Sequence, residues 1–308
     1  MTDYSHSRLS KFEQCRFLYK LEYIDGIKIK RKTIEQFLGT SVHDTLEMFH
    51  NNANHGKIET IDGVCAYYHM VWDQQWTDDI LIVNASYTKD HYRMRGEQYI
   101  RDYYQRFANG DLDSLNIVSI EQTNKMGITP ENRYYVKIDK LCCNGGTYFV
   151  CDYKTSVEML TLEKAKMDRQ LAMYALWVYE TYPDVQKVVQ RWHMLHFGKD
   201  VDVDHTREEL ESIKAKVAEQ IVKIEQCTDF PTNRTRLCDY CAYQMMCPEF
   251  KHLHQIESLP KEDVCEDDGV RLVDELAATE AMKRQAEIRI DELKEDIIQY
   301  HKRFGVDA

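Results

Sequence analysis

Two carboxylates and a lysine near the middle of the chain have the residue types and the spacing of a hydrolytic metal centre. Asp139 lies in one apolar stretch, and a second stretch ends in Asp152-Tyr153-Lys154. Carboxylate oxygens suit Mg²⁺ and Mn²⁺, and a cation held there polarises a phosphoryl group and lowers the pKa of a bound water. Lys154 shares a strand face with Asp152, where it could orient the attacking water. The pattern predicts cleavage of a phosphodiester.

Three more residues have types and positions that suit this centre. His43 lies on an expected helix and offers a further metal ligand, and Gln170 and Tyr174 lie one helical turn apart downstream. Taken singly, such a histidine is more often a core residue, and Asp-x-Lys occurs by chance in most chains of this size. The prediction depends on these groups occurring together.

Four of the ten cysteines form a second candidate site. Cys15 stands alone near the N-terminus, whereas Cys238, Cys241 and Cys247 form a C-x₂-C-x₅-C run that Pro248 follows. Four thiolates are enough for a [4Fe–4S] cluster, and zinc is the chemical alternative. The single C-x₂-C, the proline and the distant fourth cysteine favour iron–sulfur, which would join the two ends of a domain. The other cysteines are expected to be small core residues rather than disulfides.

The elements expected to position these residues change in type along the chain. Apolar residues recur at helical spacing in segments that predict helices at 7–24, 35–52, 61–80, 86–108, 161–182 and about 210–224. Period-two alternation predicts strands at 116–123, 134–141, 147–154 and 187–197. Asn144-Gly145-Gly146 suits the turn of a hairpin between the second and third strands. The expected fold class is α/β, with a mixed central sheet flanked by helices.

Composition divides the chain near residue 257. Residues 1–256 are expected to form one domain, with a helical insertion at about 53–112. Residues 257–308 hold 15 acidic and 8 basic residues and are expected to form an acidic helical extension. Apolar residues from Ala286 to Phe304 repeat at four and three residues, as in a short coiled coil, although an arm folded onto its own domain is the simpler interpretation.

Charge and hydropathy limit the ligands and the cellular compartment that the sequence predicts. The formal net charge is −12, yet binding of an anionic polymer depends on local contacts more than on net charge. Lys28, Lys30, Arg31 and Lys32 form the densest basic run, which is either a nucleic-acid contact or a solvated loop. The N-terminus lacks a secretory signal, and no run approaches the roughly 18 apolar residues of a membrane span. We therefore expect a cytoplasmic protein with no membrane association.

These segments together resemble the RecB-like branch of the PD-(D/E)XK nuclease superfamily. Within that branch they look most like the iron–sulfur exonucleases related to the CRISPR-associated Cas-four type and to the nuclease domains of recombination helicase complexes. The similarity spans residues 12 to 250 and rests on Gly39–His43, Ile138-Asp139, Asp152–Ser156, Gln170–Tyr174 and the four cysteines. It implies a restriction-endonuclease-like core with an iron–sulfur segment.

The resemblance implies a role for each matching residue of the metal centre. His43, Asp139, Asp152 and the carbonyl of Tyr153 would bind Mg²⁺ or Mn²⁺. Lys154 would be the catalytic lysine. In this interpretation the site holds a divalent cation over the scissile phosphodiester.

Further positions follow from the same resemblance. Gln170 and Tyr174 would complete the motif after the strands, and the four cysteines would hold [4Fe–4S]. Glu121 falls where the family often has an acidic residue. Val136, three residues before the motif aspartate, stands where the family usually has glycine. That departure concerns the space left for substrate beside the strand, because valine has a side chain where glycine has none.

The function expected from these residues is a metal-dependent DNA exonuclease that prefers single strands or frayed ends. Two alternatives stay open: an endonuclease acting on flaps or splayed arms, and a catalytically silent adaptor that binds DNA or a helicase. Intact Asp139, Asp152 and Lys154 favour an enzyme over the adaptor. The C-terminal extension is the expected place for a protein partner from CRISPR adaptation or from a recombination or helicase complex.

Overall fold

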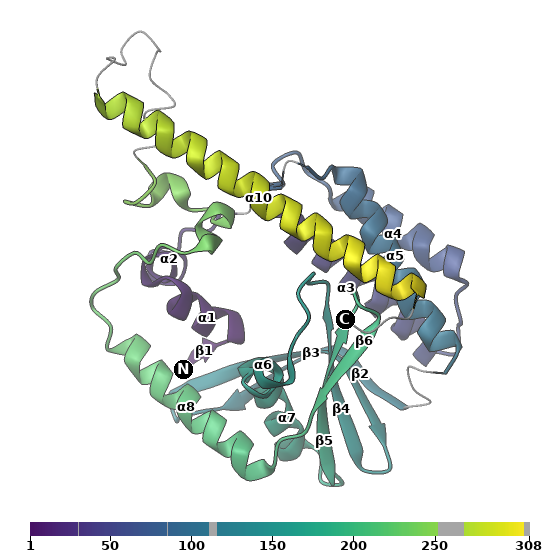
Figure 1. The fold of residues 1–308 in the computed structure, drawn as a ribbon. Coiled ribbons are helices and arrows are strands. Elements are labelled where there is room, and N and C mark those ends of the chain that lie inside the picture. Colours follow the sequence, from purple (N-terminus) through teal and green to yellow (C-terminus); the bar gives the residue numbers. More distant parts are fainter. Residues whose placement is uncertain (30, 85, 111–115, 252–267, 305–308) are drawn as a thin grey trace.

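A six-stranded mixed sheet forms the centre of the fold in the computed structural model, which describes residues 1–29, 31–84, 86–110, 116–251 and 268–304 (Figure 1). Strand β3 (Asn132–Asn144) pairs along one edge with antiparallel β2 (Asn116–Gly127). Its other edge pairs with parallel β1 (Thr2–Tyr4) and antiparallel β4 (Thr147–Lys154). The order continues through parallel β5 (Lys187–Met194) to antiparallel β6 (Lys199–Val203). The predicted mixed sheet is confirmed.

The turn between β3 and β4 has the form expected from its glycines. Gly145 and Gly146 have φ angles of 56° and 81°, which glycine adopts without strain. This hairpin fixes the register of the two strands, pairing Lys140 with Cys151. Asp139 and Asp152 each lie one residue farther from the turn than this pair. They are therefore brought to the same end of the hairpin.

One face of the sheet is covered by α1 (His6–Gln14), α7 (Arg169–Thr181) and α8 (Arg207–Glu225). Buried side chains from these helices pack on residues of β3 and β5 such as Ile138 and Trp192. Helix α7 begins at Asp168, whose side chain accepts a hydrogen bond from the backbone N–H of Leu171. This start sets the rotation with which α7 presents its residues to the strand ends.

A second apolar core lies between the other face of the sheet and three helices, α3 (Ile34–Asn54), α4 (Ile61–Gln75) and α5 (Lys89–Ala108). Each of these helices begins after a threonine whose hydroxyl accepts a hydrogen bond from a backbone N–H of the first turn. Tyr153 of β4 is a member of this core. The end of β4 is thereby locked between the two cores.

Two of the predicted helices are wrong as single elements. The helix expected at 7–24 breaks at Cys15, whose backbone is extended (φ −161°, ψ 113°), between α1 and α2 (Arg16–Tyr19), and a π-helical turn, η1 (Lys20–Ile24), follows. The helix expected at 161–182 is interrupted at Asp168, between α6 (Leu162–Lys166) and α7. In both places a local backbone break overrides a continuous apolar pattern.

The strand predicted at 187–197 is also wrong in its extent. It ends at Met194, and the chain turns through Gly198 (φ 60°) into β6, which had not been predicted. Strand β6 is short and follows a turn whose glycine was not recognised as a hairpin signal.

The cysteine segment returns to the N-terminal helices after α8. It contains two 3₁₀ turns, η2 (Arg236–Tyr240) and η3 (Gln244–Met246). The Phe17 backbone N–H donates to the Pro231 carbonyl at 3.2 Å, and the Asn233 amide donates to the Gln14 carbonyl at 2.8 Å. Hydrogen bonds therefore join the cysteine segment to the N-terminal helices.

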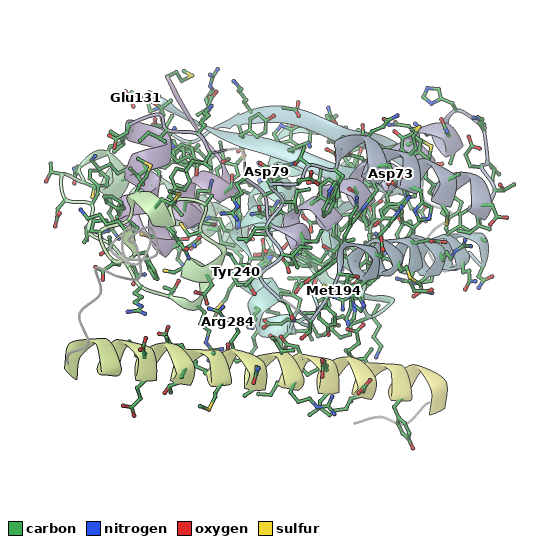
Figure 2. All side chains as sticks on the ribbon, turned by 90° about the horizontal axis from the view of Figure 1, so that it is seen from above. Asp73, Asp79, Glu131, Met194, Tyr240 and Arg284 are labelled. Atoms are coloured by element: carbon green, nitrogen blue, oxygen red, sulfur yellow. The ribbon has the colours of Figure 1, made fainter. Side chains whose placement is uncertain are left out.

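Helix α10 (Asp268–Phe304) lies along the outside of the body, crossing from the cysteine segment toward α4 and α5 (Figures 1 and 2). Ion pairs join Glu280 to Arg234 at 3.6 Å and Glu295 to Arg95 at 2.6 Å. Apolar residues of the helix, including Leu276 and Ile290, stay exposed. The described part of the predicted extension is thus a helix along the body, and residues 257–267 and 305–308 of that extension lie outside the described ranges.

In the described part of the chain, none of the helices combines the length and the apolar character that crossing a bilayer requires.

Gly96 permits the close approach of α5 to α3 and α4, which predicts that Gly96→Ala is destabilising. An added Cβ would lie 2.1 Å from the Tyr68 hydroxyl oxygen and 2.6 Å from Leu38 Cδ1, and both side chains are buried. We expect a loss of about 1–3 kcal/mol in the free energy of unfolding, because overpacking forces neighbours to shift. Urea denaturation measures it. Gly127→Ala, where nothing lies within 4 Å of the added Cβ, is the control, and equal stability of both variants would contradict the close packing.

Candidate active site

Three side chains that can bind a metal converge between α3 and the middle of strands β2 and β3. His43 of α3, Glu121 of β2 and Asp139 of β3 each offer a ligand atom, and these atoms all lie within 4.8 Å of one another. Sequence analysis predicted His43 and Asp139 as ligands and noted Glu121 only through the family resemblance. The structure brings the three together from segments separated by up to 96 positions.

Strand register explains why Glu121 faces Asp139. The ladder pairs Ile120 with Lys140 and Gln122 with Ile138, which sets Glu121 opposite Asp139. Glu121 has a φ of 49°, a left-handed backbone conformation that costs a glutamate of order 1 kcal/mol or more. Among the described non-glycine residues it is the one with positive φ, and such strain concentrates at functional sites. The backbone is distorted at the point where the carboxylate meets the site.

Asp139 is the most constrained member of the group. Its Oδ2 accepts a hydrogen bond from the Tyr153 backbone N–H at 3.0 Å and lies 3.3 Å from Nδ1 of His43. Burial raises the pKa of Asp139 to about 7, and the His43 side chain and the Tyr153 N–H oppose this while Asp152 and Glu121 add to it. Nε2 of His43 contacts the Tyr153 carbonyl at 2.8 Å. Tyr153 thus fixes both neighbours through its backbone.

Asp152 and Lys154 share a face of β4, as the two-residue spacing predicted. Lys154 Nζ lies 2.8 Å from Asp152 Oδ2, and Asp152 is buried. Burial lowers the pKa of Lys154, but the adjacent Asp152 carboxylate outweighs it and the net pKa is raised. Asp152 stands outside the group of three that His43 belongs to, although its charge acts on Asp139. The lysine is held beside the metal-binding group.

Gln170 and Tyr174 lie on α7, one turn apart as expected. Gln170 Nε2 donates to the Tyr174 hydroxyl at 3.4 Å. Burial raises the pKa of Tyr174, and the charges of Asp152 and Asp139 add to the effect. The polar pair of this helix is therefore within the electrostatic influence of the two aspartates.

Two residues near Lys154 were missed by sequence analysis. His6 of α1 is subject to the charges of Asp168, Lys154 and Asp152, and burial lowers its pKa. Asp168 also acts on Lys154. Neither residue belongs to a motif, and His6 approaches only because α1 packs on the sheet. Asp168 has one recognisable sequence signal: aspartate favours the position just before a helix, which Asp168 occupies in front of α7.

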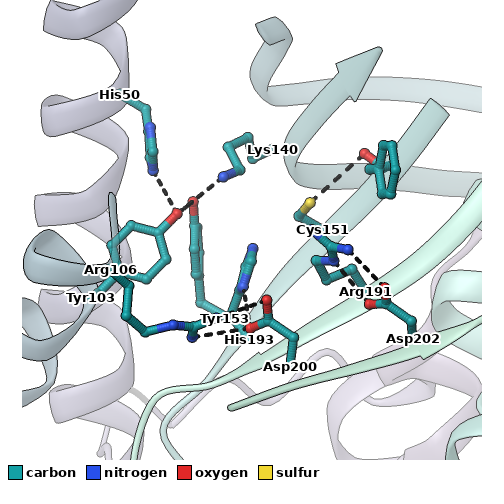
Figure 3. A network of polar contacts seen from close by, with 11 residues as sticks. His50, Tyr103, Arg106, Lys140, Cys151, Tyr153, Arg191, His193, Asp200 and Asp202 are labelled. Atoms are coloured by element: carbon teal, nitrogen blue, oxygen red, sulfur yellow. Dashed lines mark hydrogen bonds and ion pairs between the residues drawn. The ribbon is translucent and has the colours of Figure 1, made fainter. Parts of the chain in front are cut away.

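A buried polar layer supports Tyr153 from behind (Figure 3). The Tyr103 hydroxyl lies 3.2 Å from that of Tyr153, accepts a hydrogen bond from Lys140 Nζ at 3.0 Å and lies 2.8 Å from His50 Nε2. The Tyr153 ring also stacks on His193, with centroids 5.4 Å apart. A buried network of this kind restrains the side chains that it joins. It holds the backbone that contacts Asp139 and His43.

An ion pair anchors the far end of this layer. His193 Nδ1 lies 2.8 Å from Asp200 Oδ1, and Arg106 contacts both carboxylate oxygens of Asp200 at 2.9 Å and 3.1 Å (Figure 3). Bidentate pairing of this kind is among the stronger polar contacts. Because Arg106 is on α5 and Asp200 on β6, the helical layer and the sheet edge are joined behind the site.

The four predicted cysteine ligands line one small cavity between the N-terminal helices and the cysteine segment. Cys15 reaches it from the break between α1 and α2, and Cys238, Cys241 and Cys247 come from the turns η2 and η3 and their ends. Burial raises the pKa of Cys241, and the nearby thiols add to this. The extended backbone at Cys15 allows its side chain to leave the helix axis and face the other three.

Comparison with known proteins gives the family. A family model of the PD-(D/E)XK nuclease superfamily matches residues 3–248. The chain belongs to this superfamily. The match confirms the superfamily that the motifs resembled, and it makes the enzyme class a nuclease. The iron–sulfur branch stays a prediction. No curated protein matches the chain.

Two solved structures resemble parts of the fold. One is the crystal structure of a proposed exonuclease from Eubacterium rectale, which is 12% identical, covers 85% of this chain and 90% of its own, and has a TM-score of 0.47. The other is the crystal structure of SSO0001, also 12% identical, covering 79% of this chain and 96% of its own, with a TM-score of 0.31. Likenesses this distant say nothing of a substrate.

The donor set of the PD-(D/E)XK centre fits a hard divalent cation. It consists of an imidazole and two carboxylates, with Asp152 close enough to raise the pKa of Asp139. Like charges gathered in a buried place are unfavourable unless a cation compensates them. Burial is the main cause of the raised pKa of Asp139, and the charge of Asp152 adds to it.

Mn²⁺ should therefore stabilise the protein through Asp139. Saturating Mn²⁺ is expected to raise the melting temperature by roughly 5 °C, as about 2–3 kcal/mol of ligand stabilisation implies for a chain of this size. The gain should be larger at pH 8 than at pH 6, because binding must displace the proton that Asp139 holds below its pKa of about 7. Differential scanning fluorimetry measures both effects.

Asp139→Asn should lose this response, whereas the control Asp44→Asn should keep it. Asp44 is next to His43 in sequence but accepts a hydrogen bond from Gln75 on the outer side of α3. An Asp139→Asn protein that still gains stability from Mn²⁺ as the wild type does would place the metal elsewhere.

Proposed function

We propose that this nuclease is a metal-dependent deoxyribonuclease that acts as an exonuclease on single-stranded DNA or frayed ends. The observation that carries the proposal is the convergence of His43, Glu121 and Asp139 beside the Asp152–Lys154 pair. Superfamily membership supports hydrolysis of a phosphodiester. Preference for single strands is the finer part of the proposal, and the basic groove described below supports it.

The residues that would hold Mg²⁺ or Mn²⁺ are His43, Asp139 and Asp152, with the Tyr153 carbonyl as predicted and with Glu121 added by its proximity. When bound, the cation supplies Lewis-acid polarisation of the phosphoryl group and a more acidic water. The chain contributes the alignment of these ligands, because Tyr153 contacts two of them through its backbone.

Lys154 is the catalytic lysine of the proposal. Its ammonium group is held beside Asp152, where it can hydrogen-bond the attacking water and offset charge that develops on the phosphate. The raised pKa keeps Lys154 charged through the neutral range, so its role is electrostatic and orienting. Tyr174 and Gln170 lie on the helix above and would position the phosphate.

The cysteine cavity is proposed to hold [4Fe–4S] through Cys15, Cys238, Cys241 and Cys247. The donor chemistry fits, since four thiols from separate segments face one cavity, and zinc stays the alternative. A cluster there would reinforce the contacts of Phe17 and Asn233 that already join the ends of the domain. Its role in this proposal is structural.

Two other functions stay distinguishable from the proposed one. A flap or splayed-arm endonuclease would use the same catalytic residues, and a silent adaptor would bind DNA without cutting it. The exposed apolar residues of α10 support a protein partner on this extension, from CRISPR adaptation or a recombination or helicase complex. We place the activity in the cytoplasm, where thiols stay reduced.

Cleavage of an end-labelled single-stranded oligonucleotide with Mn²⁺, Mg²⁺ or EDTA tests the proposed function. Wild-type protein should give a metal-dependent ladder, and Lys154→Ala or Asp152→Ala should lower the rate at least about 100-fold, because each removes a group that acts on the reacting water or its cation. Lys164→Ala, an exposed lysine of α6, is the matched control.

The form of the substrate separates the alternatives. Covalently closed circular single strands should resist an exonuclease, and their cleavage would favour the endonuclease. Full activity of Lys154→Ala would refute the assigned mechanism, and inactive wild-type protein that still binds DNA would favour the adaptor.

Cys238→Ala should yield a colourless and poorly soluble protein, because one ligand of the proposed cluster is lost. Iron content, visible absorbance and yield of soluble protein measure the effect. Cys227→Ala should retain iron, because Cys227 lies outside the cavity and its thiol donates a hydrogen bond to the Asp229 carbonyl. Normal iron content and stability in Cys238→Ala would refute the cluster, and stoichiometric zinc in the wild type would replace it.

A further inference from the structure

A groove of about 1000 Å³ opens between the N-terminal helices, the start of α3, the end of α4 and the cysteine segment. We call it the basic groove and define it by Lys28, Arg31, Lys32, Gln36, Tyr240 and Tyr243. It adjoins the cysteine cavity, and the residues that line both are Gln14, Leu18, Leu237, Cys241 and Tyr243. Neither the catalytic proposal nor the cysteine site uses its cations.

Three cations of this groove are uncompensated. Lys28, Arg31 and Lys32 are exposed, and none forms an ion pair with a residue in the described ranges. Two carboxylates also line the groove, but Glu22 is paired with Lys11, which leaves Asp79 as the opposing charge. The fourth residue of the basic run, Lys30, lies outside the described residues. The lining therefore favours an anionic ligand.

The basic loop is held at its two ends, unlike an ordinary solvated loop. At one end the Tyr243 hydroxyl donates to the Ile27 carbonyl at 2.8 Å and accepts from the Ile29 N–H at 3.5 Å. At the other end the Leu81 N–H donates to the Lys32 carbonyl at 2.9 Å. The cysteine segment and the helical layer thus hold the backbone on both sides of the cations, which lowers the entropy cost of binding.

Aromatic and apolar groups accompany the cations. Tyr240 is 42% exposed, and Ile29 and Leu237, also on the lining, are 37% and 52% exposed. Exposed aromatic rings beside cations suit a single-stranded nucleic acid, whose bases stack on them while its phosphates meet lysine and arginine. A duplex hides its base faces and would leave these groups unused.

Helix α3 connects the groove to the metal centre. Gln36 lines the groove, and His43 lies seven residues further on the same helix. Positions seven apart share a helix face, and the rise between them is roughly 10 Å. A strand lying in the groove would therefore continue along α3 to the three metal-binding side chains.

We propose that the basic groove binds the unpaired DNA strand that leads to the metal centre, with Lys28, Arg31 and Lys32 on its phosphates and Tyr240 under a base. This inference rests on the proposed nuclease function and specifies how its substrate is held. It accounts for a single-strand preference by the shape and chemistry of one surface.

Binding of a fluorescent oligothymidylate to the full chain in EDTA tests the groove without cleavage. The triple variant Lys28→Ala/Arg31→Ala/Lys32→Ala should bind about ten- to hundredfold more weakly, and the slope of log affinity against log salt should fall by about 2, as three lost phosphate contacts on a single strand predict. Tyr240→Ala should weaken binding about tenfold with an unchanged salt slope, because stacking releases no counterions.

Lys199→Ala/Lys216→Ala/Lys223→Ala is the matched control, since it removes the same charge from exposed lysines outside the groove. Its affinity should stay close to the wild-type value. Equal weakening by the control would show a diffuse effect of net charge and overturn the groove. Wild-type affinity in the groove variant, or equal binding of duplex and single strand, would do the same.

A short chromogenic thymidine phosphodiester separates the groove from the catalytic centre. The groove variant should hydrolyse it at the wild-type rate while losing activity on the oligonucleotide, because the short substrate does not reach the cations. Loss of both activities would overturn the assignment of the groove to binding alone. Wild-type protein that binds through the groove yet cleaves neither substrate would remove the nuclease proposal and leave the groove supported.

Discussion

The burial of neighbouring carboxylates is the constraint on which this structure depends. Glu121 and Asp139 face each other across two strands, and Asp152 is close enough to raise the pKa of Asp139. The contacts around them reduce the repulsion: Lys137 pairs with Glu121, Lys154 with Asp152, and the Tyr153 N–H with Asp139. Each contact offsets the charge of one carboxylate, and the group of His43, Glu121 and Asp139 could hold a metal ion.

The strands and buried side chains behind these carboxylates hold them in this arrangement. The hairpin of β3 and β4 sets the aspartates at one end, and Tyr153 holds two of the metal-binding side chains through its backbone. Tyr153 is itself fixed by the Tyr103 hydroxyl and by stacking on His193. The aromatic and polar residues of α5 therefore act on the site without touching it, and precise geometry is obtained from buried contacts that a surface loop could not provide.

The sequence predicts the residues whose position follows from local spacing. Asp152 and Lys154 share a face because side chains alternate between the two faces of a strand. The glycine turn before them identifies the hairpin in the sequence. Glu121 could not be placed from periodicity, because its contribution depends on the β2–β3 register and on a left-handed backbone within a strand. The breaks at Cys15 and Asp168 were missed since apolar periodicity continues through both, and tertiary contacts decide where each helix ends. His6 approaches the site only through packing.

Helix α10 is attached by a different kind of force from the rest of the chain. The two cores are held by apolar burial, which ionic strength hardly changes, whereas the described ion pairs of α10 join Glu280 to Arg234 and Glu295 to Arg95. The first of these pairs is well exposed, and counterions screen such pairs over a Debye length of about 8 Å at physiological salt. Rising salt therefore weakens the Glu280–Arg234 contact more than it weakens the two apolar cores, so the attachment of α10 at this end depends on ionic strength.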